Sequence, residues 1–174
     1  MPAEFYIKLL IIVFLAVFIA AFGPVVFRGA PYAPSKPKTI ARMLRLAGIK
    51  AGERVCDIGS GDGRIVIALA RAGAQAIGIE KNIFLVWWSR LKIKTAGLSG
   101  QAKIIHADLW KFNFSEFSCV TVFGIIFIMK DLEKKLQAEL KPGARVISNL
   151  YTFPSWPVKT EEDKIYLYQK SYKS

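Results

Sequence analysis

The chain has 174 residues, of which 53% are hydrophobic, and its formal net charge at pH 7 is +12. Its single histidine, with no nucleophile elbow nearby, argues against a Ser-His-Asp hydrolase. Two cysteines, Cys56 and Cys119, are too few for a disulfide scaffold, and no Cys/His cluster has metal-ligand spacing. We expect both cysteines to be small core residues.

The hydrophobic excess lies at the amino end. Residues 9–27 contain no charged side chain, and about 20 helical residues cross a hydrocarbon core of roughly 30 Å. Residues 1–27 are therefore predicted to form one transmembrane anchor. A cleaved signal peptide is the alternative, but residues 20–24 offer no small-x-small cleavage site. The basic flank after residue 27 predicts a single-pass membrane protein whose larger part faces the cytoplasm or an equivalent matrix.

The first 27 residues carry only Glu4 and Lys8, so the net charge of +12 belongs entirely to the rest of the chain. Such a balance suits an anionic partner. The inner membrane leaflet is one candidate, because it attracts juxtamembrane Lys and Arg by about 1 kcal/mol each. Nucleic acid is the other. We favour the membrane, since the basic residues are scattered and no nucleic-acid module is visible.

Residues 28–37 are rich in proline and are predicted to form a linker. The following residues, 38–174, alternate between helical and strand patterns, beginning with a helix at 38–47 that Gly48 ends. Further helices are expected at 65–72, 84–96 and 132–140, and strands at 54–58, 75–79, 102–106, 120–123, 144–148 and 165–169. This alternation predicts an α/β fold with a parallel sheet covered by helices on both faces.

A glycine loop follows the strand at 54–58, in the sequence Asp57-Ile58-Gly59-Ser60-Gly61-Asp62-Gly63. Glycines allow a sharp turn and close approach of a ligand to bare backbone, while the next helix presents free N–H groups. Arg64 stands where the dinucleotide fingerprint has its last glycine, which disfavours hydride chemistry. The loop therefore predicts a nucleotide-like ligand.

Two more acids end the next two strands, Glu80 after residues 75–79 and Asp108 after residues 102–106. Carboxylates at these positions can accept hydrogen bonds from an amino group or a ribose. An aspartate after a strand is also a common turn or cap residue, so both interpretations of Asp108 stay open.

With these three acids the sequence resembles the class I S-adenosylmethionine-dependent methyltransferases. The resemblance implies a Rossmann-like domain with a mostly parallel, seven-stranded sheet whose last strand is antiparallel near the edge. It implies S-adenosylmethionine as the cofactor, with the methionine part on the glycine loop, the ribose on the acid of the second strand and the adenine amine facing the third acid. The implied cofactor-binding residues are Asp57, Ile58, Gly59, Ser60, Gly61, Gly63, Glu80, Lys81, Asn82, Asp108 and Leu109.

Over residues 31–156 the chain is similar to membrane-associated lysine methyltransferases, whose mitochondrial members modify the ATP synthase c subunit and the adenine nucleotide translocase. The matching segments are 31–35, 57–65, 85–91, 108–111, 122–124, 132–136 and 140–146. The resemblance implies a protein-lysine N-methyltransferase that acts on a membrane protein, with the c subunit as first candidate. It implies in-line attack of the lysine amine on the methyl group, without a metal. Residues 125–129 depart from the family because they are wholly apolar and lack its proline.

Two aromatic residues are candidates for the acceptor pocket. Phe123, at the end of the fourth strand, lines the lysine channel or simply packs in the core. Tyr32 covers the cofactor or is an interfacial tyrosine. An apolar channel of Phe123 and residues 125–126 would lower the pKa of the acceptor lysine. No general base is predicted, since His106 is expected to be solvated or hydrogen-bonded.

Other functions stay open at this point. The segment after the fourth strand lacks the Asn-Pro-Pro-Tyr or Asp-Pro-Pro-Tyr signature of many nitrogen methyltransferases, which disfavours nucleic-acid methylation. A small-molecule or lipid methyltransferase and a non-catalytic cofactor-binding module remain alternatives. In the helix at 84–96, we expect at least one of Trp87 and Trp88 to pack on the sheet, while the other contacts lipid or a membrane-bound substrate.

Overall fold

A computed structural model describes residues 4–13, 35–124 and 126–171. Residues 35–171 belong to one compact unit and residues 4–13 to another. The elements of the larger unit are α2 (Pro37–Ala47), β1 (Arg54–Ile58), α3 (Arg64–Arg71), β2 (Gln75–Glu80), α4 (Ile83–Thr95), β3 (Ala102–His106), β4 (Cys119–Val122), the 3-10 helix η1 (Ile126–Ile128), α5 (Met129–Glu139), β5 (Arg145–Asn149), β6 (Thr160–Glu162) and β7 (Ile165–Gln169).

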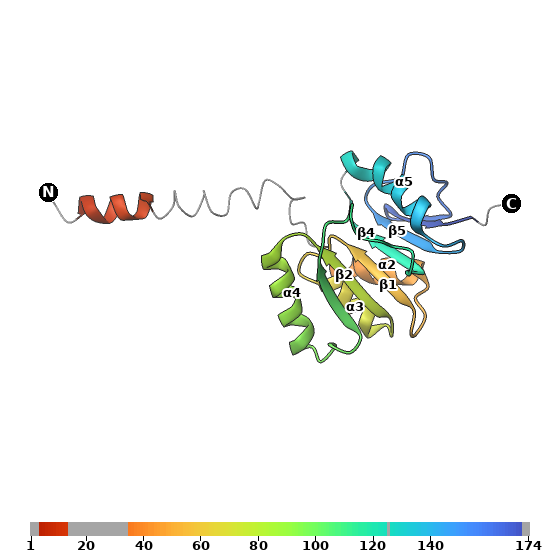
Figure 1. Ribbon diagram of the computed structural model, residues 1–174, viewed down its shortest axis with the longest axis horizontal. Coiled ribbons are helices and arrows are strands. Elements are labelled where there is room, and N and C mark those ends of the chain that lie inside the picture. The colour runs from red at the N-terminus through yellow and green to blue at the C-terminus, as the bar shows by residue number, and fades with distance from the viewer. Residues whose placement is uncertain (1–3, 14–34, 125, 172–174) are drawn as a thin grey trace. The chain divides into compact units, whose positions relative to one another are not determined.

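Seven strands form one sheet in the order β3-β2-β1-β4-β5-β7-β6 (Figure 1). Strands β1 to β5 are parallel, and β7 runs antiparallel between β5 and β6. The predicted α/β class, the seven-stranded sheet and the antiparallel last strand are confirmed. The strand order reverses between β1 and β4, and open α/β sheets bind ligands at the carboxyl ends of the strands beside such a reversal.

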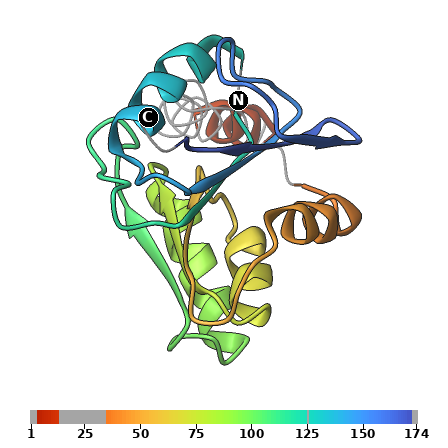
Figure 2. The ribbon, with the colours of Figure 1, turned by 90° about the vertical axis from the view of Figure 1, so that its right-hand side faces the viewer.

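Helices cover both faces of the sheet, as predicted. α2, α3 and α4 contribute to one hydrophobic cluster, and α5 contributes to a second one on the other face. Figure 2 shows α2 and α5 on opposite sides of the sheet. All four residues of β4 are buried, which is typical of a central parallel strand. Cys56 and Cys119 are buried and free, which confirms their expected place in the core.

The sequence does not predict β6, an edge strand made of three polar residues. It forms a hairpin with β7 through Asp163 and Lys164, which have φ values of 50° and 61°. Such two-residue turns need left-handed backbone and usually contain glycine, so the sequence gives no turn signal here. Ion pairs from Arg42 of α2 to Glu162 and Asp163 hold the hairpin in place.

The prediction that Trp87 or Trp88 packs on the sheet is wrong, because these side chains are 73% and 54% exposed. Val86, Ser89 and Ile93 turn toward the sheet instead and are buried. A helix rotates by about 100° per residue, so this inward face leaves both indoles on the outer side.

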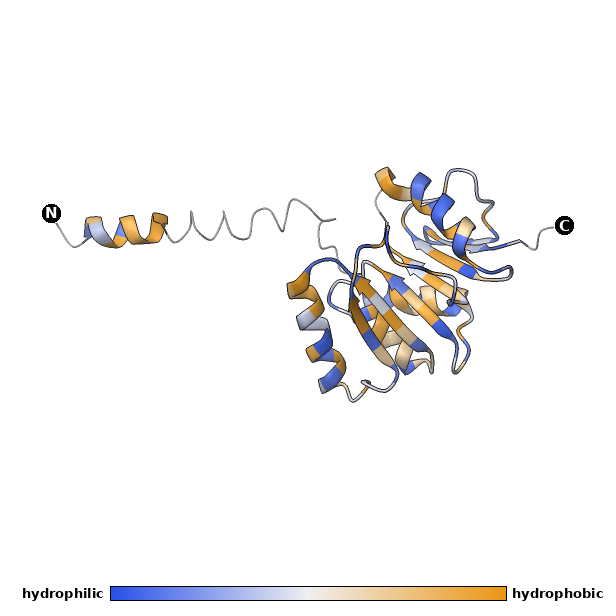
Figure 3. Ribbon diagram, in the orientation of Figure 1, coloured by the Kyte–Doolittle hydropathy of each residue, from blue (hydrophilic) through white to orange (hydrophobic). Residues whose placement is uncertain are grey.

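Residues 4–13 form a helix with exposed side chains, mostly hydrophobic in Figure 3. Among the residues that the structure describes, no helix is both long and apolar enough to cross a membrane. The predicted anchor, residues 1–27, and linker, residues 28–37, fall largely outside the described residues. Both stay predictions.

Candidate cofactor and acceptor site

The glycine loop connects β1 to α3 at the carboxyl edge of the sheet, beside the reversal in strand order. Gly59, Gly61 and Gly63 have φ values of 68°, 53° and 77°, a region that side chains with a Cβ rarely adopt. The backbone N–H groups of Gly59 and Ser60 donate to the carbonyl oxygen of Ile79 at 2.9 and 3.0 Å, which fixes the loop against the end of β2. A Cβ added to Gly59 would meet no heavy atom of the described residues within 4 Å, so these residues leave open space beside the loop.

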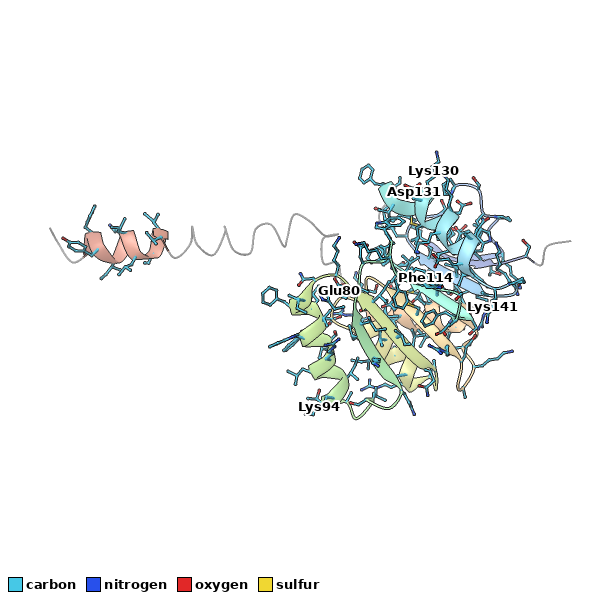
Figure 4. The ribbon with its side chains drawn as sticks, in the orientation of Figure 1. Glu80, Lys94, Phe114, Lys130, Asp131 and Lys141 are labelled. Carbon is cyan, nitrogen blue, oxygen red and sulfur yellow. The ribbon has the colours of Figure 1, made fainter. Side chains whose placement is uncertain are left out.

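Glu80, the last residue of β2, holds two neighbouring segments together. Its Oε2 accepts the Gly61 N–H at 3.0 Å, and its Oε1 accepts the Asn82 N–H at 2.7 Å. A carboxylate can accept about four hydrogen bonds. The half-buried side chain therefore keeps acceptor capacity for a ribose hydroxyl pair, the role that the resemblance implies. Figure 4 shows Glu80 where β2 meets α4.

Asp108 and Asn82, two more of the expected site residues, lie in the turns after β3 and β2. Asp108 forms an ion pair with Lys81 at 2.8 Å and accepts the Trp110 N–H at 3.1 Å. These hydrogen bonds lower the pKa of Asp108 and keep it ionised. Asn82 caps α4, because its Oδ1 accepts the N–H groups of Phe84 and Leu85.

The remaining expected residues contribute chiefly through position. The side chain of Ile58 is buried in the second core cluster, and Leu109 packs against that cluster. Only the backbone of Ile58 is therefore available to a ligand. His106 is exposed, and its Nε2 lies 3.0 Å from the carbonyl oxygen of Lys81. His106 is therefore solvent-exposed and within hydrogen-bonding distance of the backbone, as the sequence predicts.

Asp57 is buried at the end of β1. The Thr121 hydroxyl on β4 donates to its Oδ1 at 2.6 Å. Burial raises the pKa of Asp57 to about 7, opposed by the Thr121 hydrogen bond and reinforced by the carboxylates of Glu80 and Asp62. This side chain is therefore poised to change charge near neutral pH.

Behind the glycine loop lies a buried polar cluster that the sequence does not predict. Asp62 is 5% exposed and accepts two hydrogen bonds from the Arg64 guanidinium, both at 2.9 Å, and one from Lys92 of α4 at 2.7 Å. Burial opposes ionisation of Asp62, but Arg64 and Lys92 outweigh it and hold the pKa well below its usual range. Arg64 also donates to the Ser35 carbonyl oxygen at 3.1 Å. This cluster holds the start of α2 beside the glycine loop. One sign of it is visible in the sequence, because Arg64 stands where the dinucleotide fingerprint has its last glycine.

Close packing under the loop explains a glycine within β2. A Cβ on Gly78 would lie 2.6 Å from the Cβ and Oγ of Ser60 and 2.7 Å from the Cδ1 of Ile104. Ser60 Oγ is itself buried, and among the described residues it has no hydrogen-bond partner. The loop therefore sits on β2 without room for a side chain between them.

The acceptor side of the site follows β4. Val122 pairs with Ile58, the last residue of β1, so Phe123 lies at the level at which the glycine loop starts. Phe123 is half-buried, whereas Ile126 is 63% and Phe127 90% exposed. Residue 126 therefore does not close the predicted apolar channel. Tyr32 and residue 125 lie outside the described residues, so their predicted roles stay predictions.

A cavity of about 280 Å³ lies elsewhere, where β1, β2 and β3 begin, and includes Arg54, Gln75 and Lys103. It contains none of the expected site residues. The described residues also include no group of three or more His, Cys, Asp or Glu side chains able to hold a metal ion.

The carboxyl edge fits S-adenosylmethionine. The bare loop backbone and the open space at Gly59 suit the methionine part. Glu80 offers acceptors for the ribose, Asp108 an acceptor for the adenine amine, and Asp57 a carboxyl group for a cationic amine. Fold and site together define a class I methyltransferase whose cofactor is S-adenosylmethionine.

Comparison with known proteins identifies the family. The profile described as the ANTKMT methyltransferase domain matches residues 57–160, and the chain belongs to this family. The lysine N-methyltransferase of the ATP synthase c subunit from mouse (Mus musculus) is 47% identical over 126 residues, which are 72% of this chain and 51% of the mouse protein. This chain thus spans about half the length of that relative.

Two further relatives match over most of their own length. A protein-lysine N-methyltransferase of Saccharolobus islandicus (strain REY15A) is 34% identical over 131 residues, which are 74% of this chain and 81% of that protein. The crystal structure of an RNA methyltransferase from Salinibacter ruber in complex with S-adenosyl-L-homocysteine has a TM-score of 0.79 and 31% identity. It covers 82% of this chain and 96% of its own.

Proposed function

We propose that this protein is a membrane-anchored, S-adenosylmethionine-dependent protein-lysine N-methyltransferase that acts on a membrane protein. One observation carries the proposal: the family match over residues 57–160 spans the glycine loop, Glu80, Asp108 and Phe123 together. The mouse relative is named for lysine methylation of the ATP synthase c subunit and the archaeal relative for protein-lysine methylation. The c subunit of an ATP synthase is therefore our first candidate acceptor.

The proposed location rests on the sequence. Residues 9–27 are long enough to span a bilayer, and the basic flank after them favours a catalytic domain on the cytoplasmic or matrix-equivalent side. Nine residues, 28–36, connect the anchor to α2, which limits their span to roughly 30 Å at full extension. A juxtamembrane lysine lies within that reach, whereas a distant soluble acceptor gains nothing from the anchor.

The chemistry needs a neutral acceptor amine. When bound, S-adenosylmethionine supplies the methyl group that is transferred. A lysine amine has an ordinary pKa of about 10.4, so at neutral pH it carries a proton and has no free electron pair. Phe123 follows the β4 residue that pairs with Ile58, and its side chain is apolar and half-buried. Apolar surroundings of this kind lower a lysine pKa by desolvation. The acceptor amine loses its proton to water before the transfer, so positioning and desolvation are enough for the proposed activity without a side-chain base.

Direct labelling tests the function. The full chain, with cofactor labelled in its methyl group, is incubated with membranes from a strain that lacks the enzyme, with extracted RNA and with lipid vesicles. We expect label on a small membrane protein whose intact mass rises by one to three methyl groups. Gly61→Arg, which fills the loop, serves as the inactive control. Label found only in RNA or only in lipid would contradict the proposal.

RNA is a second candidate acceptor, because the Salinibacter ruber neighbour is described as an RNA methyltransferase and this chain is strongly basic. Against RNA stands the absence of the base-methylation signature after β4. The RNA arm of the same experiment decides between the two acceptors.

A further inference from the structure

The outer face of α4 is apolar and exposed. Trp87 is 73%, Trp88 54% and Leu91 52% exposed, and these residues fall on adjacent turns of one helix face. The opposite face, with Val86 and Ile93, is buried against the sheet. Figure 3 shows that hydrophobic residues run along much of this helix. Two adjacent exposed indoles in a water-facing position call for a partner that covers them.

The surroundings of this face are basic. α2, α3 and α4 lie in one layer over the same core cluster, and their sequences contain eight Lys and Arg residues and no Asp or Glu. Four of the eight, Arg42, Arg45, Arg64 and Lys92, form ion pairs with Asp62, Glu162 or Asp163, which leaves the layer with an excess of positive charge. On the other face of the sheet, α5 carries Asp131, Glu133 and Glu139 among its lysines. Lys94 is exposed at the carboxyl end of α4, next to the apolar stripe (Figure 4). With these ion pairs counted, the helical layer still has more basic than acidic side chains, and the outer face of α4 is apolar.

This combination selects the partner. Indoles have an apolar body and a polar N–H, and they are enriched where a bilayer meets water. Lys and Arg beside them are attracted to anionic headgroups. A second copy of this chain fits less well, because protein interface cores are depleted of Lys and pairing these faces would oppose like charges.

We propose that the outer face of α4 docks on the headgroup region of an anionic bilayer and forms a second membrane contact, separate from the amino-terminal segment. Trp87, Trp88 and Leu91 insert, and Lys94 lies among the headgroups. α4 begins at Ile83, three residues after Glu80, so the amino end of this surface adjoins the proposed cofactor site. Docking would therefore orient the carboxyl edge of the sheet at the membrane surface, whichever acceptor the enzyme uses.

Spin labelling of the full chain tests the contact without requiring turnover. Trp88→Cys carries a nitroxide on the proposed surface, and Ala138→Cys carries one on the exposed side of α5 as the matched control. The native Cys56 and Cys119 are buried and should stay unlabelled. The protein is reconstituted into vesicles of phosphatidylcholine with or without phosphatidylglycerol. At each site the collision rate with oxygen is compared with that of a water-soluble nickel complex.

We expect the oxygen-to-nickel ratio at position 88 to be at least about threefold higher than at position 138 in anionic vesicles, and to fall in neutral ones. Equal ratios at the two positions would overturn the proposal. So would a ratio that is equally high in neutral vesicles, that rises in concentrated detergent solution without lipid, or that rises only when an acceptor protein is added.

Activity gives a second measurement. Trp87→Ser with Trp88→Ser should reduce turnover of a membrane-embedded acceptor about tenfold while leaving cofactor affinity unchanged. Val158→Ser, at a site that is 41% exposed, is the control and should have no effect. If no acceptor is methylated at all, the proposed function fails, yet the labelling result still decides the membrane contact. A double variant with normal turnover in anionic membranes would count against docking.

Discussion

Asp57→Asn is expected to change how stability depends on pH. In the folded protein the pKa of Asp57 is about 7, raised mainly by burial. In the unfolded chain an aspartate has a pKa of about 3.9. Between these values the unfolded chain has released its proton while the folded protein keeps it. The unfolded state therefore binds fewer protons, and the contribution of Asp57 to stability falls as pH rises from about 4 to about 7.

The magnitude follows from the shift. About three pKa units at 1.36 kcal/mol each give about 4 kcal/mol as an upper bound. Asparagine is neutral at every pH, and its amide oxygen can still accept the Thr121 hydroxyl, which lies 2.6 Å from Asp57 Oδ1. The variant should therefore gain stability relative to the original protein as pH rises. For a domain of this size, the difference in melting temperature should grow by up to about 10 °C.

Thermal unfolding of both proteins at pH 5, 6, 7 and 8 tests this expectation. Comparing the two proteins at each pH cancels the carboxylates that lie far from Asp57, since these titrate equally in both. A melting-temperature difference that stays constant from pH 5 to pH 8 would refute a near-neutral pKa for Asp57. Cofactor binding supplies an independent check, because affinity should rise with pH whereas the contribution of Asp57 to stability falls. A cationic ligand favours the ionised carboxylate, so affinity should rise with pH in the original protein and stay flat in Asp57→Asn.

Three further outcomes are expected. Glu80→Ala should weaken S-adenosylmethionine binding about ten- to a hundredfold, since a charged acceptor is lost. Calorimetry measures the affinity, with Glu161→Ala at an exposed position as the control. Unchanged affinity in a folded Glu80→Ala variant would remove the assignment of Glu80 to the ribose. Gly78→Ala should destabilise the domain by about 1–3 kcal/mol, because the new Cβ would lie 2.6 Å from Ser60 Oγ. Urea unfolding measures the change, with Gly100→Ala as the control, since a Cβ there meets no atom of the described residues within 4 Å. Equal unfolding midpoints for the two variants would argue against the clash. Carbonate extraction should leave the full chain in the membrane fraction, and a soluble full chain would contradict the proposed anchor.

Much of the fold could be predicted because several signals agree locally. The strands at 54–58 and 102–106 are short apolar segments next to polar turns, and the structure places both at the predicted bounds. The number of strands and the antiparallel last strand were expected only from the family resemblance, and the strand order was not predicted, since periodicity gives no information on which strands are neighbours. The positions of Glu80 and Asp108 at one edge follow from the rule that parallel strands end together.

Other features depend on tertiary contacts that a single sequence does not reveal. β6 exists because β7 offers it a partner and Arg42 holds its acidic turn, not because three polar residues favour a strand. The inward face of α4 was misjudged because apolar residues occur on every side of that helix. Ser89, a small polar residue, is fully buried there, and a Cβ on Gly63 would come within 2.8 Å of its Cβ. The inward face of α4 therefore combines the apolar Val86 and Ile93 with a small residue, Ser89, that allows close contact with the glycine loop.

The carboxyl edge of the sheet holds Asp57, Asp62, Glu80 and Asp108, and different neighbours stabilise each of these carboxyl groups. Asp108 pairs with Lys81. Asp62 is ionised and neutralised by Arg64 and Lys92. Glu80 spreads its charge over two backbone N–H groups. Among the described residues, Asp57 has one side-chain donor, the Thr121 hydroxyl, and no cationic partner, and burial drives it toward the neutral form. When environments push the pKa values of neighbouring acids apart, the unpaired one is the group available to a ligand. Binding a cationic ligand such as S-adenosylmethionine would supply the charge that Asp57 lacks, so the destabilised carboxyl group becomes a source of affinity.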